Sequence, residues 1–392
     1  MPGDGLVAFE SNTYKHLETA IRDSLMRLLG LKIAPFAAEY TGAGVLPAQR
    51  GTMKKLINLP ENMVDEMLQG IYAAHSDQVT CVNGDLRCLV TCTKHQGKVA
   101  LATGGGSGHL PLFLGYVGEG MLDGCCVGGV FQSPSADRML EVTKAIDNGA
   151  GVLYIYGNYG GDVMNFELAA EMAGIENIRV EQVLGAEDVA SAPKGSEARR
   201  RGVAGIFFLY KIAGALAARM ATLDQVKAVA EKTASRVRSM GVALSPCTIP
   251  EVGKPTFSIQ EGEMEIGMGI HGEAGVSKGP IQPADSVVDH VLGKILEDMP
   301  CEKGDTVSVL INGLGATPLE ELYVLYRRVD QVLREMGITI HRAYVGEFAT
   351  SMEMAGASIS LLKLDAELKE LLDHSAHTPF FSQPSRHGKE VA

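Results

Sequence analysis

Two glycine-rich stretches decide the fold class. Residues 98–118 read KVALATGGGSGHLPLFLGYVG, and residues 151–173 read GVLYIYGNYGGDVMNFELAAEMA. In each stretch a short apolar run predicts a buried strand, glycines predict a tight turn, and a helical pattern follows. Strand, turn and helix in this order are typical of parallel βα units. The sequence therefore predicts an α/β protein with mixed or parallel sheets.

The pattern of turns divides the chain into three parts. Residues 1–52 are expected to be an N-terminal extension and linker, with an amphipathic helix near 11–33. Residues 53–237 are expected to form a first α/β domain that carries the glycine turns and ends in a long helical stretch reaching about residue 240. Residues 238–392 are expected to form a second α/β domain with shorter strands, and residues 380–392 a frayed tail.

Composition and charge exclude several classes of protein. The 392 residues are 46% hydrophobic and 21% charged, and 35 Lys and Arg against 47 Asp and Glu give a net charge of −12. An acidic chain repels phosphate backbones and anionic membrane surfaces, which disfavours nucleic-acid or membrane-surface binding. No apolar run reaches the roughly 20 residues of a transmembrane helix. With no secretory signal evident at the N-terminus, we expect a cytoplasmic protein.

The cysteines do not predict a disulfide framework or a metal site. The seven cysteines are odd in number and contain no CxxC pair, which fits a reducing compartment. Cys81, Cys88 and Cys92 together with His95 could be read as a zinc site, but their spacing matches no closed zinc pattern. We therefore expect no bound metal and no redox function.

Three turns carry side chains that could perform chemistry. His109 ends the turn GGGSGH, Asp162 follows the glycines of GNYGGD, and His271 lies between Ile270 and Gly272 in GMGIHGEAG. Ligands of open α/β sheets gather at the carboxyl ends of strands, where such turns lie. A glycine turn with free N–H groups and a histidine suits a small, oxygen-rich ligand.

From the residues alone, structural explanations remain open for the same three positions. His109 could be solvated at a tight turn, Asp162 could cap a helix, and His271 could be packed. Neither a P-loop nor a dinucleotide-binding G-x-G-x-x-G is present, because His109 stands where the third glycine would be. We therefore expect no nucleotide cofactor on this chain.

A set of motifs resembles those of a known family. In chain order they are GGGSGH, QSPSAD, GNYGGDVMNFE, RRRGVAG, CTIPEVGKPTF, GIHGE and NGLGATPLEELY. Their order and spacing, from about Met53 to about Thr378, resemble the dihydroxyacetone kinase family, in particular the substrate-binding subunit of the bacterial two-component enzymes. The resemblance implies two α/β domains with the ligand near their contact, and a homodimer.

The resemblance also implies roles for individual residues. His271 would add through a ring nitrogen to the ketone and form a hemiaminal. Asp162 would accept the proton of the attacking hydroxyl, while His109 would orient and stabilise the adduct. Three further residues would hydrogen-bond the substrate: Gly106, Ser107 and Ser133. Covalent capture makes physical sense because dihydroxyacetone has too few atoms for strong non-covalent binding, and because it rejects glycerol, which has no carbonyl.

The resemblance implies a partner as well. Single-chain members of the family append a helical ATP-binding domain that has no counterpart in this sequence, so we expect a separate helical nucleotide-binding kinase subunit holding Mg-ATP or Mg-ADP. ATP and phosphoenolpyruvate both remain open as the ultimate phosphoryl donor. The alternative is a non-catalytic ketose-binding coactivator paralogue. The presence of both His109 and Asp162 favours the kinase subunit, since a sensor needs only capture.

Two positions depart from the family pattern. Gly157 stands where bacterial members commonly have a lysine that contacts a substrate oxygen, and Leu110 stands where they tend to have a glutamate. The loss of a lysine frees volume, so a four-carbon, erythrulose-like ketose is a candidate substrate beside dihydroxyacetone. The alternative is that Gly157 is required for a backbone with positive φ.

Overall fold

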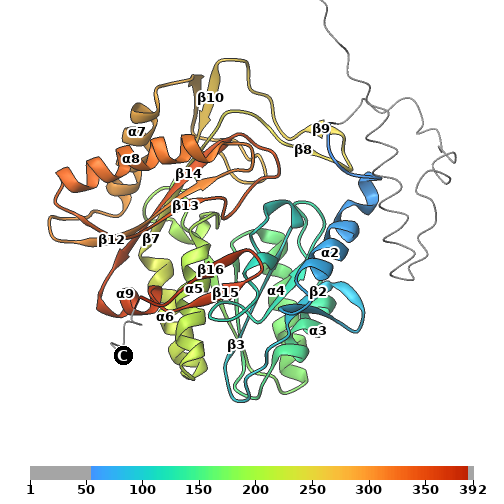
Figure 1. Cartoon of the computed structure of the whole chain (residues 1–392). Helices are drawn as coiled ribbons and strands as arrows, with labels where there is room; N and C mark the ends of the chain where they lie inside the picture. The colour runs from blue at the N-terminus through green and yellow to red at the C-terminus, as the bar shows by residue number, and fades with distance from the viewer. Residues whose placement is uncertain (1–53, 387–392) are drawn as a thin grey trace, which may run out of the picture. The chain divides into compact units, whose positions relative to one another are not determined.

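The computed structural model describes residues 54–386, which belong to one compact unit. The helix expected near residues 11–33, the rest of the N-terminal extension and the last six residues lie outside the described range. The described chain builds two six-stranded sheets with helices packed against them, which confirms the expected α/β class with two sheet layers (Figure 1).

The first sheet is mixed and has the order β1-β2-β4-β3-β5-β6. Its strands are β1 Val79–Val82, β2 Asp85–Thr91, β3 Ala100–Gly105, β4 Gly124–Val127, β5 Val152–Gly157 and β6 Val180–Gly185. β4, β3, β5 and β6 run parallel, whereas β1 and β2 are antiparallel additions at one edge. Every residue of β3 and β5 is buried, as expected for parallel strands that are covered on both faces.

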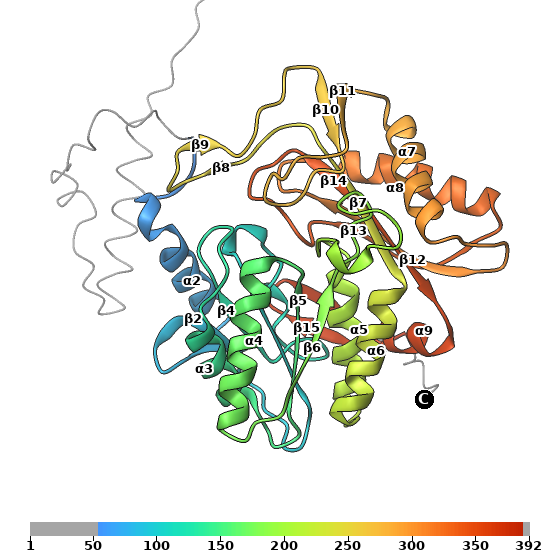
Figure 2. The same ribbon diagram turned by 180° about the vertical axis from the view of Figure 1, so that it is seen from behind.

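Helices cover both faces of the first sheet. On one face, α3 Ala136–Ile146 and α4 Gly160–Ile175 pack against Tyr154 and Tyr156 of β5. On the other face, α5 Ile206–Ala218 and α6 Leu223–Ser235 pack against the alternate strand residues (Figure 2). α2 Met63–Ala74 and the short helix η1 Pro60–Asn62 precede the sheet in the chain.

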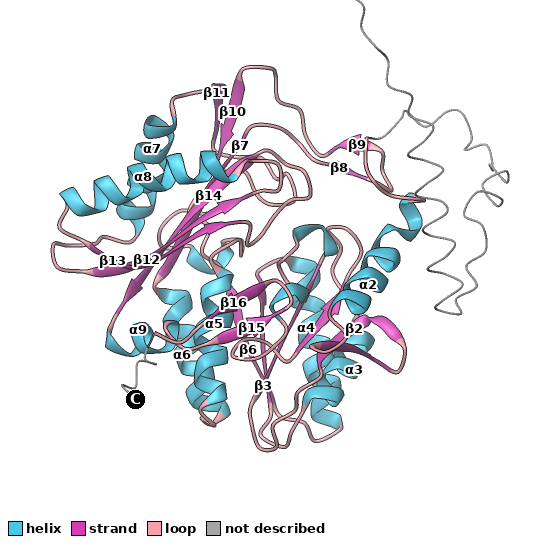
Figure 3. Ribbon diagram, in the orientation of Figure 1, coloured by secondary structure: helices cyan, strands magenta, loops and turns pink. Residues whose placement is uncertain are grey.

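The second sheet is mostly antiparallel, with the order β11-β10-β7-β14-β12-β13. Its strands are β7 Val237–Ala243, β10 Glu263–Ile266, β11 Ser277–Pro280, β12 Thr306–Gly313, β13 Thr339–Gly346 and β14 Gly356–Leu364. Only β12 and β13 pair in parallel. α7 Ala284–Asp298 and α8 Leu319–Glu335 cover one face (Figure 3). Both helices match the expected spans of 285–298 and 318–336.

Helix α5 joins the two sheets through an aromatic core. Its residues are mostly apolar and are buried on nearly all sides, with Lys211 as the one charged side chain, which is typical of a helix in the centre of a core. Its Phe207 ring contacts Tyr344 of β13 and Phe348, with ring centroids 5.1 and 5.0 Å apart. The two layers therefore share one core at α5, and loops of the second sheet are held close to the turns of the first.

Two expected segments are wrong. The long helical stretch is two helices, because Met220 adopts a left-handed φ of 61° and Thr222 with Gln225 forms a capping box that starts α6. The chain is already in strand β7 at Val237, not helical to 240. The tail expected over residues 380–392 is not frayed at its start, because β16 Phe381–Gln383 pairs with β15 Ala376–Thr378. Before this hairpin, α9 Ala366–Leu372 packs on α5.

Smaller elements complete the described range. They are η2 Ser107–His109, η3 Leu114–Tyr116, η4 Glu197–Arg199, β8 Thr248–Ile249 and β9 Lys254–Pro255. The expected domain limits of 53–237 and 238–392 stay predictions. None of the helices within residues 54–386 has the length and apolar character needed to cross a bilayer.

Candidate active site

The candidate site lies where the carboxyl ends of three parallel strands meet one loop of the second sheet. β3 ends at Gly105 and leads into η2 with His109, and β5 ends at Gly157 and leads into α4 with Asp162. β4 ends at Val127, and the loop after it carries Ser133. His271 comes from the loop between β10 and β11, and its ring lies 4.8 Å from the ring of His109, centroid to centroid.

His109 is a fully buried histidine with one unpaired ring nitrogen. Its Nδ1 lies 2.8 Å from the Thr350 carbonyl oxygen, which can only accept, so Nδ1 carries the hydrogen and Nε2 the lone pair. Burial, reinforced by nearby His271, lowers the pKa of His109 to about 3. His109 is therefore a neutral base at physiological pH, and its Nε2 is buried without a hydrogen-bond partner.

His271 also presents Nε2 to the site. Its Nδ1 lies 3.0 Å from Oε1 of Glu273. Burial opposes ionisation of Glu273, but the hydrogen bond with His271 and the charges of His271 and Arg201 outweigh it and lower the pKa of Glu273 to about 2. An ionised carboxylate can only accept, so Nδ1 of His271 is the donor. In the neutral ring the lone pair is then on Nε2.

Asp162 does not act as the cap of α4. Tyr159 occupies the N-cap position, and Oδ1 of Asp162 is buried without a partner. Burial raises the pKa of Asp162 to about 6, although the Ser133 hydrogen bond and nearby His271 oppose the rise. Asp162 is therefore a buried carboxylate, mostly ionised at neutral pH, that can still accept a proton.

The glycine turn completes the polar lining. The Ser107 hydroxyl is buried without a partner, while its main-chain N–H donates to the Gly129 carbonyl at 3.0 Å. Gly106 lets the turn approach the Phe131 main chain, because a Cβ there would lie 2.6 Å from the Phe131 Cα. Buried polar atoms in native proteins are normally hydrogen-bonded. Within residues 54–386 only five such side-chain atoms lack a partner, and three belong to Ser107, His109 and Asp162. This clustering indicates a ligand site.

The sequence interpretation missed the aromatic wall and the carboxylate behind His271. The Phe131 ring stacks on His109 with centroids 4.7 Å apart, and the Tyr159 ring lies 4.6 Å from His271. Phe131 holds a left-handed φ of 55°, which is rare for a bulky residue. Tyr159 and Glu273 lie inside the motifs GNYGG and GIHGE. Their position beside Asp162 and His271 in those motifs is the sequence signal that could have identified them.

The two departures from the family pattern adjoin residues of this site. Gly157 ends β5 and its φ is not in the left-handed region, so the positive-φ explanation is wrong. A Cβ at Gly157 would lie 3.0 Å from Cε2 of Tyr159, the residue that contacts His271. Leu110 is half-buried directly after His109, and its carbonyl accepts a hydrogen bond from Thr350 Oγ1 at 2.9 Å.

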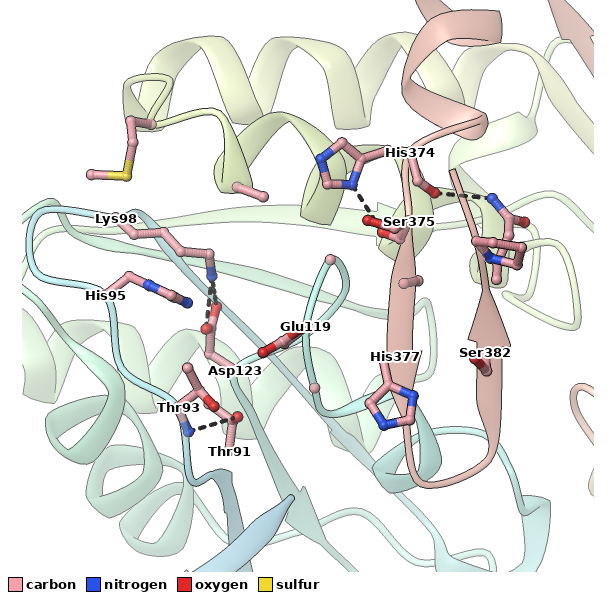
Figure 4. Close-up of a pocket in the computed structure, with 17 residues that line it drawn as sticks. Thr91, Thr93, His95, Lys98, Glu119, Asp123, His374, Ser375, His377 and Ser382 are labelled. Carbon is pink, nitrogen blue, oxygen red and sulfur yellow. Dashed lines mark hydrogen bonds and ion pairs between the residues drawn. The ribbon is translucent and has the colours of Figure 1, made fainter. Parts of the chain in front are cut away.

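A separate cavity of about 490 Å³ contains none of these residues (Figure 4). It lies near the opposite ends of β3 and β4, beside the C-terminal hairpin β15–β16. Lys98 and Asp123 face each other in it, and Lys98 Nζ contacts both carboxylate oxygens at 2.7 and 2.6 Å. The lysine charge is thus neutralised within the wall of the cavity.

The three cysteines considered for a zinc site lie away from the candidate site in the chain. All seven cysteines are free, and Cys81, Cys88 and Cys92 lie on the edge strand β1 and on or just after its neighbour β2. Across residues 54–386 the structure holds no group of three or more His, Cys, Asp or Glu side chains that could bind a metal ion.

Comparison with known proteins relates the chain to ketose kinases. The Dak1 domain matches residues 69–380. The dihydroxyacetone-binding subunit of PTS-dependent dihydroxyacetone kinase 2 of Listeria innocua is 48% identical over 330 residues, which cover 84% of this chain and 99% of that protein. D-erythrulose kinase of Mycolicibacterium smegmatis is 42% identical over 331 residues, covering 84% of this chain but 57% of that longer protein.

Solved structures give the same relation. The dihydroxyacetone kinase of C. freundii superimposes with a TM-score of 0.77 at 32% identity, covering 85% of this chain and 61% of that one. A dihydroxyacetone kinase operon co-activator superimposes with a TM-score of 0.76 at 30% identity, covering 81% of this chain and 98% of that one.

Proposed function

The chain belongs to the Dak1-domain family of dihydroxyacetone kinases, and we propose that it is the ketose-binding subunit of such a kinase. In this proposal His271 captures the ketone as a hemiaminal, and a separate nucleotide-binding subunit phosphorylates a hydroxyl of the captured ketose. The observation that carries it is the cluster of unpaired buried polar atoms on Ser107, His109 and Asp162 beside the free Nε2 of His271. A small polyhydroxy ketone would satisfy these atoms.

Capture is an addition to the carbonyl carbon. The Nε2 lone pair of His271 forms the C–N bond, the π electrons of C=O move to oxygen, and that oxygen takes one proton from the buffered solvent. Nδ1 keeps its hydrogen, so the substituted ring carries a positive charge beside the ionised Glu273, 3.0 Å away. The neutral state of His109 matters here, because a second imidazolium would repel this charge.

Asp162 is the proposed general base of phosphoryl transfer. The partner's nucleotide supplies the γ-phosphoryl group. As the ketose hydroxyl attacks phosphorus, its O–H bond breaks and the proton passes to the Asp162 carboxylate, while the nucleoside diphosphate leaves. The raised pKa of Asp162, about 6, suits a base that works near neutral pH. Ser107, Ser133 and the glycine turn at Gly106 would hold the other oxygens.

Native mass spectrometry tests capture directly. Incubation with dihydroxyacetone or erythrulose should raise the intact mass by the full mass of the ketose, and glycerol should add nothing. His271→Ala should lose this adduct while keeping its fold. The matched control is His290→Ala, at an exposed histidine of α7 that is not among the residues of the candidate site. A mass increase that persists in His271→Ala would exclude His271 as the capturing residue.

An exposed apolar surface beside the site supports a place for the proposed nucleotide-binding partner to dock. α4 begins at Gly160 next to the site, and it leaves Met164 and Leu168 on its outer side, 64% and 47% exposed. The donor must reach the hydroxyl held at Asp162, so the partner must cover this end of α4. Exposed apolar side chains beside a site are the kind of surface that an association buries. We place the docking surface of the kinase subunit there.

A turnover measurement distinguishes the kinase subunit from the alternative, a non-catalytic coactivator. A solved co-activator shares the fold, and a sensor would need only capture. The co-location of His109, Asp162 and His271 supports a kinase subunit instead. Added to a nucleotide-binding subunit with Mg-ATP or a phosphoenolpyruvate-linked donor system, the chain should support ketose phosphorylation. Capture without any turnover under both donors would favour the coactivator. We also propose a homodimer, which light scattering tests.

A further inference from the structure

The side chain of Glu273 holds His271 at two points. Oε1 accepts from Nδ1 of the ring and Oε2 accepts from the His271 main-chain N–H, each at 3.0 Å. The ring and the main chain of one residue are thus clamped by one carboxylate. With Nδ1–H engaged in this way, rotation of the ring that would turn Nε2 away from the site breaks a charge-assisted hydrogen bond.

Arg201, from the motif RRRGVAG, lies next to the Glu273 carboxylate. Its Nη1 lies 3.8 Å from Oε2 of Glu273. Its Nε and Nη2 lie 3.0 and 2.7 Å from Oδ2 of Asp188, and Nη2 also donates to the Gly267 carbonyl at 3.1 Å. Asp188 is 2% exposed. The guanidinium is therefore immobilised on a buried carboxylate, with one edge turned toward Glu273.

The backbone beside these groups leaves no space for a side chain. A Cβ on Gly269 would overlap both the Glu273 carboxylate and the Arg201 guanidinium. Gly269 thus allows the loop that carries His271 to lie directly against the ion pair. Asp188, Arg201, Glu273 and His271 form a continuous line of alternating charge that ends at the imidazole ring.

We propose that Glu273 and Arg201 are positioning residues that select the Nδ1–H tautomer of His271 and thereby hold the Nε2 lone pair toward the carbonyl. The inference rests on the proposed capture by His271 and extends it to residues outside the site. Glu273 acts directly on the ring. Arg201 acts through Glu273 by keeping it ionised and oriented, and Asp188 anchors Arg201. After capture, the same carboxylate balances the charge of the substituted ring.

The variant Glu273→Gln tests the selection with little change in shape. A glutamine has one oxygen and one NH₂ group where the carboxylate has two acceptors. The His271 main-chain N–H needs an acceptor, so the glutamine oxygen stays there and the NH₂ group faces Nδ1. This favours the Nε2–H tautomer, whose lone pair is on Nδ1, and leaves Nε2 with no lone pair to attack the carbonyl. We expect ketose affinity to fall about 10- to 100-fold, the range for removing a carboxylate that orients a metal-bound histidine.

Nitrogen-15 NMR of histidine-labelled protein reads the tautomer without any ketose. The His271 signals are assigned by their loss in His271→Gln. The wild type should show a hydrogen on Nδ1, Glu273→Gln a shift toward Nε2–H, and Arg201→Gln a smaller shift that Arg201→Lys partly restores. The matched control is Arg328→Gln, which removes another arginine paired through Nε and Nη2 with one aspartate, Asp289, on the exposed faces of α7 and α8.

The outcomes separate this inference from the proposed function. A tautomer that responds to Glu273→Gln in a protein that captures no ketose supports positioning and removes the capture proposal. A wild-type ring with its hydrogen on Nε2, or an unchanged tautomer and adduct affinity in Glu273→Gln, overturns the positioning role even if capture is real. Equal losses in Arg201→Gln and Arg328→Gln would reduce Arg201 to a general stabilising residue.

Discussion

Asp162→Asn should make the protein more stable while it removes turnover. Asp162 is 6% exposed, and burial raises its pKa from 3.8 to about 6. That difference corresponds to about 3 kcal/mol of preference for the protonated form in the folded state. At neutral pH the ionised Asp162 therefore lowers the free energy of unfolding, and residues of functional sites often reduce stability in this way.

The sign of the pH dependence follows from the raised pKa. Below the unfolded value of 3.8 both states are protonated and Asp162 imposes no penalty. As pH rises through about 6, the folded state must ionise a buried group, and its contribution to stability is lost. The asparagine side chain of the variant is neutral at every pH. The variant should therefore gain at most about 3 kcal/mol near pH 7.5 and almost nothing near pH 4.

Urea unfolding at both pH values measures this gain, with turnover and native mass measured on the same samples. Turnover with the kinase subunit should fall by about 100-fold or more, whereas the ketose adduct should remain, since the proposed C–N bond forms on His271 without a proton transfer to Asp162. In wild type, turnover should decline below about pH 6 as Asp162 becomes protonated. The control Asp373→Asn should lose stability, because His341 and Arg342 bind that carboxylate.

Two results would refute the reasoning about Asp162. A variant that is no more stable than wild type near neutral pH would mean that the carboxylate is not penalised by burial. Wild-type turnover in a folded Asp162→Asn protein would mean that another group accepts the proton.

Three further predictions concern substrate choice, the partner and stability. Gly157→Lys must displace the Tyr159 ring by a few tenths of an ångström. It should shift substrate preference from four-carbon toward three-carbon ketoses by about 1–3 kcal/mol in competitive kcat/KM measurements. Gly157→Ala is the control for crowding alone, and an unaltered preference in Gly157→Lys would mean that other residues set the choice of ketose. Met164→Glu should abolish turnover with the kinase subunit yet leave the adduct in the mass spectrum, and unchanged turnover would remove α4 from the docking surface. Asp123→Asn should lower the free energy of unfolding by about 3–5 kcal/mol, because Lys98 is left buried without its partner. The control is Asp289→Asn at an exposed aspartate paired with Arg328, which should lower the free energy of unfolding by less than about 1 kcal/mol.

The sequence by itself determined the elements whose signals are local. The spans of α7 and α8 and the strands β3 and β5 follow from hydrophobic periodicity, and the turns after those strands follow from their glycines. His109, Asp162 and His271 were identified because each lies in a motif with its neighbours in sequence. The break between α5 and α6 was missed, since the Thr222 capping box lies within an otherwise continuous helical pattern.

Only the tertiary structure decided how the candidate residues behave. His109 is neutral because the described fold excludes water from it and places His271 beside it. Thr350, from the far end of the chain, accepts a hydrogen bond from Nδ1–H and so fixes the tautomer. His271 presents Nε2 because Glu273 binds Nδ1, and Arg201 reaches Glu273 from a loop of the first layer. Burial, tautomer and proton affinity depend on which side chains meet in space. Those contacts join segments far apart in sequence, and no local pattern encodes them.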